Sequence, residues 1–536
     1  MEEGLLFGGL LPPNRKVIPL RPPSLCGEIS ILDRSESFSM KYISTRSSSP
    51  AITSKEAIIK GIAPDNGLYV PSSFPHLGSA ALESSEHESY VSRSTKILRA
   101  FLTDFAPAEL TAACRSAYSD NFDTPLVAPV RFLGDKIAVL ELWHGPTLAF
   151  KDMALQLMPW LVKTAILSER DPYKIVILVA TSGDTGKAAL EGFADVEGVS
   201  IFVFYPHEGI SEIQRLQMVT QRGSNVGVCG VLGNFDDAQS GVKRIFFEPE
   251  ITDRLERLHF RFSSANSINW GRLAPQIVYY FSAYEDLIAS GKIKRGQSIN
   301  LCVPTGNFGN ILAAYYAFKC GLPISKLICA SNVNKVLTDF IRSGIYDKRR
   351  EFYKTESPSM DILVSSNLER LVFELADRKT EQILNWMSQL VSEGWYQISD
   401  NALGRLQSLF YGNFADPADT AKAIKEAFEK YGYLMDPHSA VGYSVLQKFR
   451  EETGDDTFTL LVSTASPFKF NRAVLNAIGR DTSNKDEFSL LQELSSILGQ
   501  PVPAKLAELE SLPEIHQGMC EKEEMAKVIL KFLGIN

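Results

Sequence analysis

Short, continuously apolar segments spaced along the chain constrain its fold most strongly. They are KIAVLEL (136–142), KIVILVA (174–180), VSIFVFY (199–205), SINLCVP (298–304), KLICAS (326–331) and FTLLVST (458–464). Continuous rather than alternating apolarity is typical of parallel strands that are covered on both faces. Amphipathic segments at 187–196, 210–219 and 311–321 lie between them and predict helices. The alternation indicates an α/β protein with open, mostly parallel sheets.

The length of 536 residues is enough for two or three domains. Residues 1–39 contain PPN and RPP with little periodicity, and we expect a disordered extension or a mis-called start. The expected domains follow in order: a mainly helical N-terminal domain at 40–125, a first sheet domain at 126–295, a second sheet domain at 296–480 with a helical insertion at about 365–455, and a helical tail at 481–536.

Charge and cysteine usage exclude several classes of protein. The net charge of −8 and the pI of about 5.6 argue against binding to nucleic acid or to an anionic membrane. No apolar run approaches the ~20 residues of a membrane span. The seven cysteines form no CxxC pair and no Cys/His cluster at zinc spacing, so we expect reduced thiols and no metal. Because Glu2 and Glu3 do not fit a targeting signal, we expect a cytoplasmic protein.

Two glycine-containing loops each follow a predicted strand and open a predicted helix. They are TSGDTG (181–186) and TGNFGN (305–310). Backbone N–H groups and the helix dipole gather anions at such places, although a single loop of this kind is often only a steric necessity. No Gly-Lys-Ser/Thr follows the second loop, and no ribose-binding acid lies downstream. The ligand should therefore be a small phosphate ester rather than a nucleotide.

Lys151 lies between Phe150 and Asp152, directly behind the Gly145-Pro146 turn in HGPTLAFKD. Taken alone, such a lysine is usually a solvated surface residue. Together with two anion-binding loops, it indicates pyridoxal phosphate held as a Schiff base on Lys151. The lysine must be partly desolvated so that its amine can be neutral at working pH.

Five segments occur in the same order as in a known family. HGPTLAFKD, ATSGDTG, SANSINWGR, PTGNFGN and DPHSAVGY closely resemble threonine synthase, a fold-type II pyridoxal-phosphate enzyme related to the tryptophan synthase β chain. The resemblance runs from about Met40 to Arg472, and YISTR…GIAPDNGLYVP (42–71) is similar to the family's opening segment. It implies a fold-type II enzyme with two open sheet domains.

The resemblance also implies roles for individual residues. Lys151 matches the lysine that bonds to the cofactor and then moves protons, and Thr464 matches the hydroxyl that faces the pyridine nitrogen. The loop that receives the substrate carboxylate and the cofactor's ring oxygen matches Ser182, Gly183, Asp184, Thr185 and Gly186. The loop around the cofactor phosphate matches Thr305, Gly306, Asn307, Phe308, Gly309 and Asn310. Candidates for the substrate's own phosphate are Asn266, Ser267, Asn269, Arg272 and Lys469; the alternative for the NSINWGR segment is a capped helix start.

The implied reaction converts O-phospho-L-homoserine and water to L-threonine and phosphate, the last step of threonine biosynthesis. Two alternatives remain: a threonine-synthase-like phospholyase that releases 2-oxobutyrate, and a non-catalytic pyridoxal-phosphate-binding paralogue. The expected partner is a small-molecule substrate, without nucleic acid or membrane, and the chain is a monomer or a homodimer.

The sequence departs from the family at TASPFKF (464–470), where TAHPAKF is usual: Ser466 replaces His and Phe468 replaces Ala. These changes put the substrate in question rather than the cofactor. His438 is either a hydrogen-bond donor behind the site or a structural histidine. His144 either lines the site or only orients the turn that follows it.

Overall fold

Two β-sheets form the framework of the structure, a computed structural model. It describes residues 39–47, 50–77, 88–169, 172–181, 183–207, 210–233 and 235–535. The predicted extension at 1–39 lies, apart from Ser39, outside the described residues.

The first sheet is entirely parallel, in the order β15-β7-β6-β5-β8. Its strands are β5 (Lys174–Ala180), β6 (Val199–Pro206), β7 (Val226–Val231), β8 (Phe260–Ser263) and β15 (Met519–Cys520). From Ile175 onward every residue of β5 is buried, as expected for a strand covered on both faces. β7 was not predicted, because Gly227 and Gly230 interrupt its apolar run.

The second sheet has the order β13-β10-β9-β14-β4-β3, and only the β3–β4 pair is antiparallel. Its strands are β3 (Val130–Phe132), β4 (Ile137–Glu141), β9 (Ile299–Pro304), β10 (Ile324–Ser331), β13 (Phe410–Phe414) and β14 (Thr459–Ser463). Two small antiparallel pairs complete the strands: β1 (Tyr42–Ser44) with β2 (Tyr69–Pro71), and β11 (Ile345–Asp347) with β12 (Trp395–Gln397). Each of the six predicted strands forms, and the α/β class with mostly parallel sheets is confirmed.

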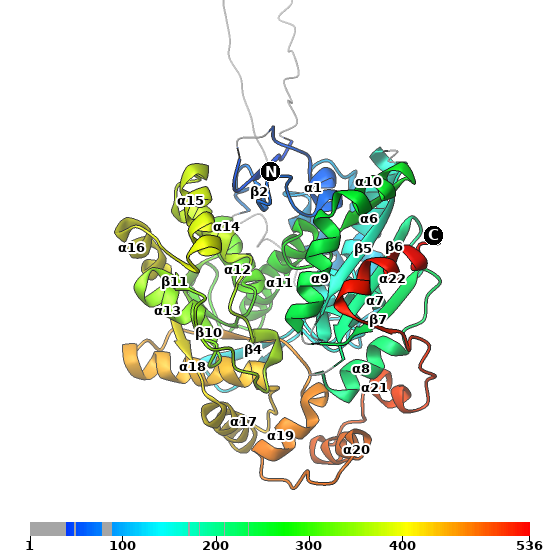
Figure 1. Cartoon of the computed structure of the whole chain (residues 1–536). Helices are drawn as coiled ribbons and strands as arrows, with labels where there is room; N and C mark the ends of the chain where they lie inside the picture. The colour runs from blue at the N-terminus through cyan, green and yellow to red at the C-terminus, as the bar shows by residue number, and fades with distance from the viewer. Residues whose placement is uncertain are drawn as a thin grey trace, which may run out of the picture. The chain divides into compact units, whose positions relative to one another are not determined.

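Helices lie around both sheets and between them. They are α1 (Ser54–Lys60), α3 (Tyr90–Leu98), α4 (Pro107–Tyr118), α5 (Asp152–Leu155), α6 (Met158–Glu169), α7 (Asp184–Phe193), α8 (Glu212–Val219), α9 (Phe235–Phe247), α10 (Pro249–Arg257), α11 (Trp270–Ala289), α12 (Gly309–Lys319), α13 (Val336–Ser343), α14 (Leu368–Leu375), α15 (Thr380–Ser392), α16 (Asp400–Leu409), α17 (Pro417–Tyr431), α18 (Pro437–Thr453), α19 (Asn471–Ala477), α20 (Glu487–Leu498), α21 (Ala504–Ala507) and α22 (Met525–Phe532), with 3-10 turns η1 (Pro358–Met360), η2 (Pro467–Phe470), η3 (Glu508–Glu510) and η4 (Lys522–Glu524). The nearly all-buried α11 lies between the two sheets (Figure 1). No described helix is both long and apolar enough to cross a membrane.

The sheets divide the chain differently from the expected domains. β3 and β4 fall inside the expected first sheet domain at 126–295, but β4 pairs with β14 in the second sheet. The expected insertion at 365–455 includes β13, an edge strand of that sheet, and α18, which packs on it. The tail at 481–536 is not only helical, because β15 extends the first sheet and α22 lies beside α9 (Figure 1). Pairing between strands distant in sequence decides these points, and local patterns do not reveal it.

This topology gathers the predicted motifs at the carboxyl ends of strands. β9, β14 and β4 are neighbours, and they lead into the 305–310 loop, Thr464 and the turn before Lys151. β5, in the other sheet, leads into the 181–186 loop. Ligands of open α/β sheets bind at such ends, so the fold itself predicts where the site lies.

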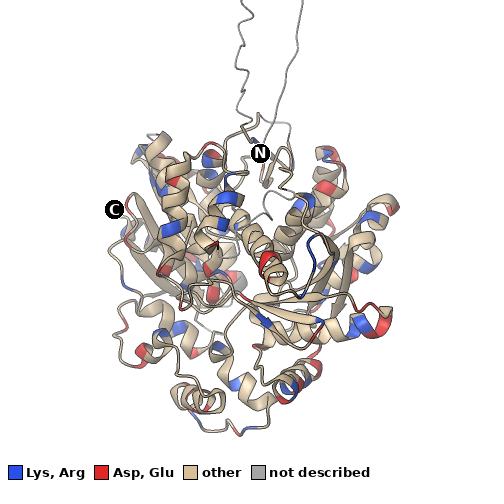
Figure 2. Cartoon of the chain, turned by 180° about the vertical axis from the view of Figure 1, so that it is seen from behind, with Lys and Arg blue, Asp and Glu red and all other residues tan. Residues whose placement is uncertain are grey.

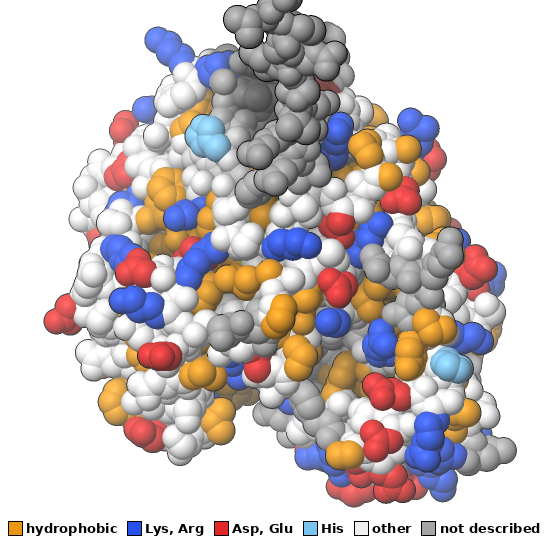
Figure 3. All heavy atoms as spheres, turned by 90° about the horizontal axis from the view of Figure 1, so that it is seen from above, with side chains coloured by type: hydrophobic (Ala, Val, Ile, Leu, Met, Phe, Trp, Pro, Cys, Tyr) orange, Lys and Arg blue, Asp and Glu red, His pale blue; other side chains and the backbone are white. Residues whose placement is uncertain are grey.

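Charged side chains of both signs are interspersed over the outer surface. In the ribbon of Figure 2, positions of Lys and Arg and positions of Asp and Glu are scattered over many helices. On the face in Figure 3, hydrophobic side chains occur in small groups between charged ones. Neither view shows an extended basic area among the described residues.

Candidate active site

Lys151 is a buried lysine at the wall of a large cavity. It immediately precedes α5, and its side chain is 10% exposed. Its Nζ donates to the Ser359 hydroxyl oxygen at 2.9 Å and lies 3.4 Å from Asp184 Oδ2. The cavity has a volume of about 930 Å³ and also reaches Phe150, Thr181, Thr185, Arg272, Gly306, Asn307, Gly309, Asn310, His438 and Thr464.

Burial is the main reason that the pKa of Lys151 is lowered and its neutral amine favoured. Burial lowers the pKa of Lys151 below its ordinary 10.5. The carboxylate of Asp184 raises this pKa, whereas the positive charges of Lys469 and Arg272 lower it further. The net shift is downward, so a larger share of this amine is neutral at working pH than in a solvated lysine.

Asp152 explains why the lysine follows a rigid turn. Its carboxylate accepts the N–H of Thr147 at 2.8 Å and the hydroxyl of Thr147 at 2.7 Å. The turn packs so tightly that a Cβ on Gly145 would be 2.5 Å from the Asp152 Cβ. Burial raises the pKa of Asp152 to about 6. Asp152 thus has a structural role, which is to fix the Gly145-Pro146-Thr147 turn in front of Lys151.

The first glycine loop is organised around Thr181 and Asp184. Thr181 Oγ1 accepts the N–H groups of Gly183 and Gly186 at 3.0 and 2.8 Å. Lys469 Nζ lies 2.7 Å from Asp184 Oδ1. Burial alone would raise the pKa of Asp184, but the charges of Lys469 and Lys151 outweigh it and hold that pKa well below its ordinary 3.8. Thr185 lines the cavity, and the predicted Ser182 lies outside the described residues.

The second glycine loop lies where α12 begins. Gly306, Asn307, Gly309 and Asn310 line the cavity, and the first N–H groups of a helix have no acceptor within it. Phe308 takes a left-handed φ of 64° and is fully buried against Phe410. The Asn310 side-chain amide donates to Pro304 O at 2.8 Å. This hydrogen bond holds the loop, and Asn310 also lines the cavity.

Substitution of the two glycines in this loop is expected to give opposite results. A Cβ on Gly306 would be 2.2 Å from the Ser359 carbonyl oxygen, a distance the backbone cannot accept, whereas a Cβ on Gly309 meets its nearest neighbours at 3.6 Å. We predict that Gly306→Ala lowers the free energy of unfolding by about 2 kcal/mol or more. Gly309→Ala, in the first turn of α12, should change it by less than about 1 kcal/mol. Urea unfolding of both variants tests this, and equal losses would contradict it.

The ANSINWGR segment divides between the cavity and a helix cap. Asn266, Ser267 and Arg272 line the cavity. Asn269 caps α11: its side chain accepts the N–H of Gly271 at 2.8 Å and donates to the Ile58 and Ser264 carbonyls. The amide of Asn269 is thus already engaged by the backbone, which favours the capped-helix alternative for this residue. The predicted Lys469 is likewise engaged, with Asp184 and with Thr147 O at 2.9 Å.

Arg272 is a buried cation with an incomplete set of partners. It is 3% exposed, and burial lowers its pKa to about 10. Its Nη1 donates to Ala265 O, while its Nε is buried and has no hydrogen-bond partner among the described residues. A buried unpaired donor of this kind is costly unless a ligand supplies an acceptor.

Of the remaining candidates, one lines the cavity and two are engaged in structural hydrogen bonds. Thr464, 5% exposed, lines the cavity. Ser466, which replaces the family histidine, accepts the N–H of Phe468 and so caps η2. His144 is not among the residues that line the cavity, and its two ring nitrogens lie 2.6 Å from Asp123 and 3.0 Å from Glu141. Burial would lower the pKa of His144, but hydrogen bonds to these carboxylates raise it to about 9.

Sequence reasoning missed the segment between β11 and α14. Residues 358–366 line the cavity, and Ser359 is the nearest hydrogen-bond partner of Lys151. The outer wall includes Met387, Leu390 and Val391 of α15. Residues 358–366, PSMDILVSS, resemble no glycine loop or charged cluster; their only signal is the Pro, Ser and Asp residues, which are typical of turns.

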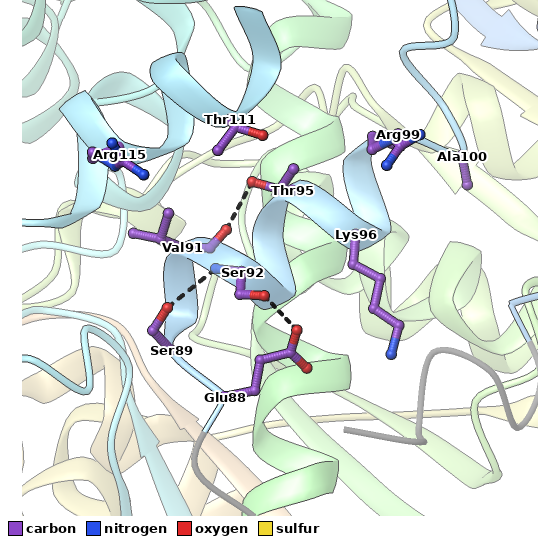
Figure 4. Close-up of a pocket in the computed structure, with 10 residues that line it drawn as sticks. All are labelled: Glu88, Ser89, Val91, Ser92, Thr95, Lys96, Arg99, Ala100, Thr111 and Arg115. Atoms are coloured by element: carbon purple, nitrogen blue, oxygen red, sulfur yellow. Dashed lines mark hydrogen bonds between the residues drawn. The ribbon is translucent and has the colours of Figure 1, made fainter. Parts of the chain in front are cut away.

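A second hollow, of about 730 Å³, lies between α3 and α4 (Figure 4). Its hydroxyls are used locally: Thr95 donates to Val91 O, and Ser92 donates to Glu88. Lys96, Arg99 and Arg115 do not converge on a common point in Figure 4. The cavity at Lys151 is therefore the candidate site.

The residues of this cavity fit pyridoxal phosphate. The Lys151 amine, with its lowered pKa, suits an aldehyde. The start of α12 and the cation of Arg272 suit anions, and Thr464 lines the same cavity.

Comparison with known proteins gives a consistent result along the chain. Residues 41–118 match the family model for the threonine synthase N terminus, residues 119–396 that for pyridoxal-phosphate dependent enzymes, and residues 439–529 that for the threonine synthase C-terminal region. Threonine synthase-like 1 of Homo sapiens is 39% identical over 477 residues, which are 87% of this chain and 62% of that protein. The chain thus spans less than two thirds of the length of that relative.

Two threonine synthases match over nearly their whole length. That of Pseudomonas aeruginosa is 38% identical over 439 residues, 82% of this chain and 90% of that protein. The crystal structure of the PLP-bound enzyme from Brucella melitensis is 35% identical, with a TM-score of 0.81, and the match covers 92% of this chain and 99% of that one. The chain therefore belongs to the threonine synthase family of pyridoxal-phosphate-dependent enzymes.

Proposed function

We propose that the protein is a threonine synthase, which converts O-phospho-L-homoserine and water to L-threonine and phosphate. The observation that supports this most is the convergence of three groups on one cavity: the Lys151 amine with its lowered pKa, a glycine loop at a helix start, and the cation of Arg272. A substrate with both an amino acid group and a phosphate needs such a set.

The cofactor would be held by residues from both sheets. Lys151 would bond to it, the 305–310 loop would receive its phosphate, and Thr464 would face its ring nitrogen. Pyridoxal 5'-phosphate, when bound, supplies an aldehyde for amine exchange and a ring that withdraws electrons from the substrate's α carbon. A hydroxyl rather than a carboxylate at position 464 leaves the ring nitrogen essentially neutral.

Lys151 would act as the base once its amine is free. Its Nζ would take the proton from the substrate's α carbon and later one from the β carbon, and it would return protons as the product forms. The lowered pKa suits this role, because a base must be neutral before it accepts a proton. Asp184, 3.4 Å away, would stabilise the ammonium that results.

The substrate's own phosphate would bind at Arg272, with Asn266 and Ser267 as neighbours. These three residues line the cavity together with Lys151. Guanidinium groups hold phosphates with paired hydrogen bonds, and Arg272 lies in the wall of this cavity. Asn269 and Lys469 are omitted from this set because their polar atoms serve the fold.

A second candidate is a phospholyase that eliminates phosphate and releases 2-oxobutyrate. The Ser466 and Phe468 departures from the family pattern are the reason to retain this candidate. The two reactions differ in whether water adds at the β carbon before the product leaves. A non-catalytic binding protein is a third candidate, against which the presence of Lys151, both glycine loops and Thr464 argues.

Product analysis separates these candidates. Full-length protein with pyridoxal 5'-phosphate and O-phospho-L-homoserine is assayed for phosphate, and the carbon product is identified by chromatography. Threonine in equal amount to phosphate is the expected result. A 2-oxo acid in equal amount would replace the proposal with the phospholyase, and bound cofactor without phosphate release would support the non-catalytic protein.

We also propose that the protein acts in the cytoplasm, as a monomer or a homodimer. The support for the compartment is that Cys114, Cys229, Cys302, Cys320, Cys329 and Cys520 are buried and form no disulfide.

A further inference from the structure

Ser359 is the closest hydrogen-bond partner of the Lys151 amine, although 208 residues separate them in the chain. Its Oγ lies 2.9 Å from Lys151 Nζ, compared with 3.4 Å for the Asp184 carboxylate. Ser359 belongs to the short turn η1, outside every sequence motif of the site.

The turn that presents Ser359 is held by buried and partly buried polar groups. Asp361 Oδ1 accepts from Asn332 at 2.7 Å, from Asn334 at 3.0 Å and from the Thr355 hydroxyl at 2.8 Å. Asp361 Oδ2 accepts the Thr355 N–H at 2.9 Å. On its other side, the Ser359 carbonyl lies so close to Gly306 that no side chain fits between them. The position of Ser359 is therefore set by the fold rather than by the lysine.

His438 adds a direct support. Its Nε2 accepts the backbone N–H of Ser359 at 3.2 Å, and its Nδ1 lies 2.7 Å from Asp436 Oδ2. This pair of contacts fits a ring that carries its proton on Nδ1, where Asp436 accepts it. Asp436 is itself fully buried and caps α18. His438 thus has a partner on each nitrogen, and one of them positions Ser359.

The charged groups that face Lys151 limit which further group can stabilise its protonated amine. They are Asp184 at the start of α7, Lys469 in η2 and Arg272 in α11, with His438 of α18 behind Ser359. A second carboxylate would stabilise the protonated amine but would also raise its pKa and remove the neutral base. A hydroxyl accepts a hydrogen bond without bringing a charge. A hydroxyl can therefore stabilise the ammonium form of Lys151 while raising its pKa less than a second carboxylate would.

We propose that Ser359 is a further catalytic residue, whose hydroxyl oxygen holds the Lys151 amine while that amine carries a proton, and that His438 positions Ser359 for this role. Only the part of this inference that concerns turnover rests on the proposed function. The hydrogen bond to the free amine is independent of which substrate the enzyme uses.

The test measures the protonation of Lys151 through its reaction with the cofactor. Full-length protein is freed of cofactor, pyridoxal 5'-phosphate is added across a range of pH, and absorbance gives the rate of covalent capture by Lys151. Because only the neutral amine reacts, the profile gives its pKa. Ser359→Ala should lower that pKa by about one pH unit, since a hydrogen bond to the charged form is lost. Capture at neutral pH should become faster.

Turnover should change in the opposite direction. The ammonium formed on proton removal loses an acceptor, so kcat should fall roughly tenfold while KM changes little. Faster capture together with slower turnover is a pattern that a merely loosened structure does not produce. Ser359→Thr keeps the hydroxyl and should restore both values.

Two further variants separate the hydroxyl from the turn and from His438. Ser357→Ala, in the same turn, removes a hydroxyl that accepts from Asn332 at 2.9 Å, and the capture pKa should not move. His438→Asn should lower the pKa less than Ser359→Ala does, and the double variant should match Ser359→Ala, because His438 acts through Ser359. Superimposable profiles for Ser359→Ala and the unaltered protein, or an equal shift in Ser357→Ala, would overturn the proposal. If the capture pKa shifts in Ser359→Ala but the unaltered protein does not turn over O-phospho-L-homoserine, the role of Ser359 is supported and the proposed function is rejected.

Discussion

Replacement of Lys151 by alanine is expected to lower the rate of phosphate release from O-phospho-L-homoserine by at least about 10⁴-fold, because it removes both the covalent attachment point and the base. The covalent link itself should disappear. Borohydride reduction of protein mixed with cofactor should label the peptide that contains Lys151 in the unaltered protein and leave the variant unlabelled.

The fold should survive this change. Lys151 is buried with a lowered pKa, so its charged form is disfavoured there, and Asp184 keeps the closer cation, Lys469 at 2.7 Å. Lys187→Met is a matched control, since Lys187 is a largely buried lysine, also with a lowered pKa, but bonds to Glu191 and Gln221. It should retain cofactor labelling. Residual activity above about one per cent in Lys151→Ala, far more than a lost base allows, would remove this lysine from the mechanism.

Much of this site could be predicted because each motif is contiguous and follows a strand. Lys151, Thr464 and the 305–310 loop come after β4, β14 and β9, whose apolar runs are visible in the sequence. Parallel strands bring such loops to one edge, so local patterns predicted the convergence without a model of the whole chain. The comparisons confirm the family and its cofactor.

Hydrogen-bond partners could not be predicted in the same way. Lys469 looked like a donor to a phosphate, and the fold instead pairs it with Asp184. Asn269 looked like another donor, but the helix start needs it as a cap. Ser359 lies in a polar turn without any motif, and only tertiary packing brings it to Lys151. A sequence shows which groups are able to bind a ligand, but the backbone and buried charges compete for the same groups.

The pair formed by Lys469 and Asp184 gives the second large expected effect, on stability. Both side chains are almost completely buried, and Lys469 Nζ lies 2.7 Å from Asp184 Oδ1. Lys469→Met should lower the free energy of unfolding by about 3 kcal/mol or more, because a buried carboxylate loses its nearest cation. Urea unfolding at neutral pH measures the loss. The charge-matched double variant Lys469→Met/Asp184→Asn should recover part of it, since neither charge is then buried alone.

The loss should depend on pH in one direction. The pKa of Asp184 in the folded protein lies below its ordinary 3.8, so the stabilisation by Lys469 is present above that value and is lost as the pH falls further. The difference between Lys469→Met and the unaltered protein should therefore be full at neutral pH and shrink in acid below about pH 4. The variant should also raise the pKa of Lys151, because a neighbouring positive charge is gone, and shift the acid limb of the activity profile to higher pH. A stability loss that stays constant through the acid range would show that packing, and not the charge pair, holds Lys469 in place.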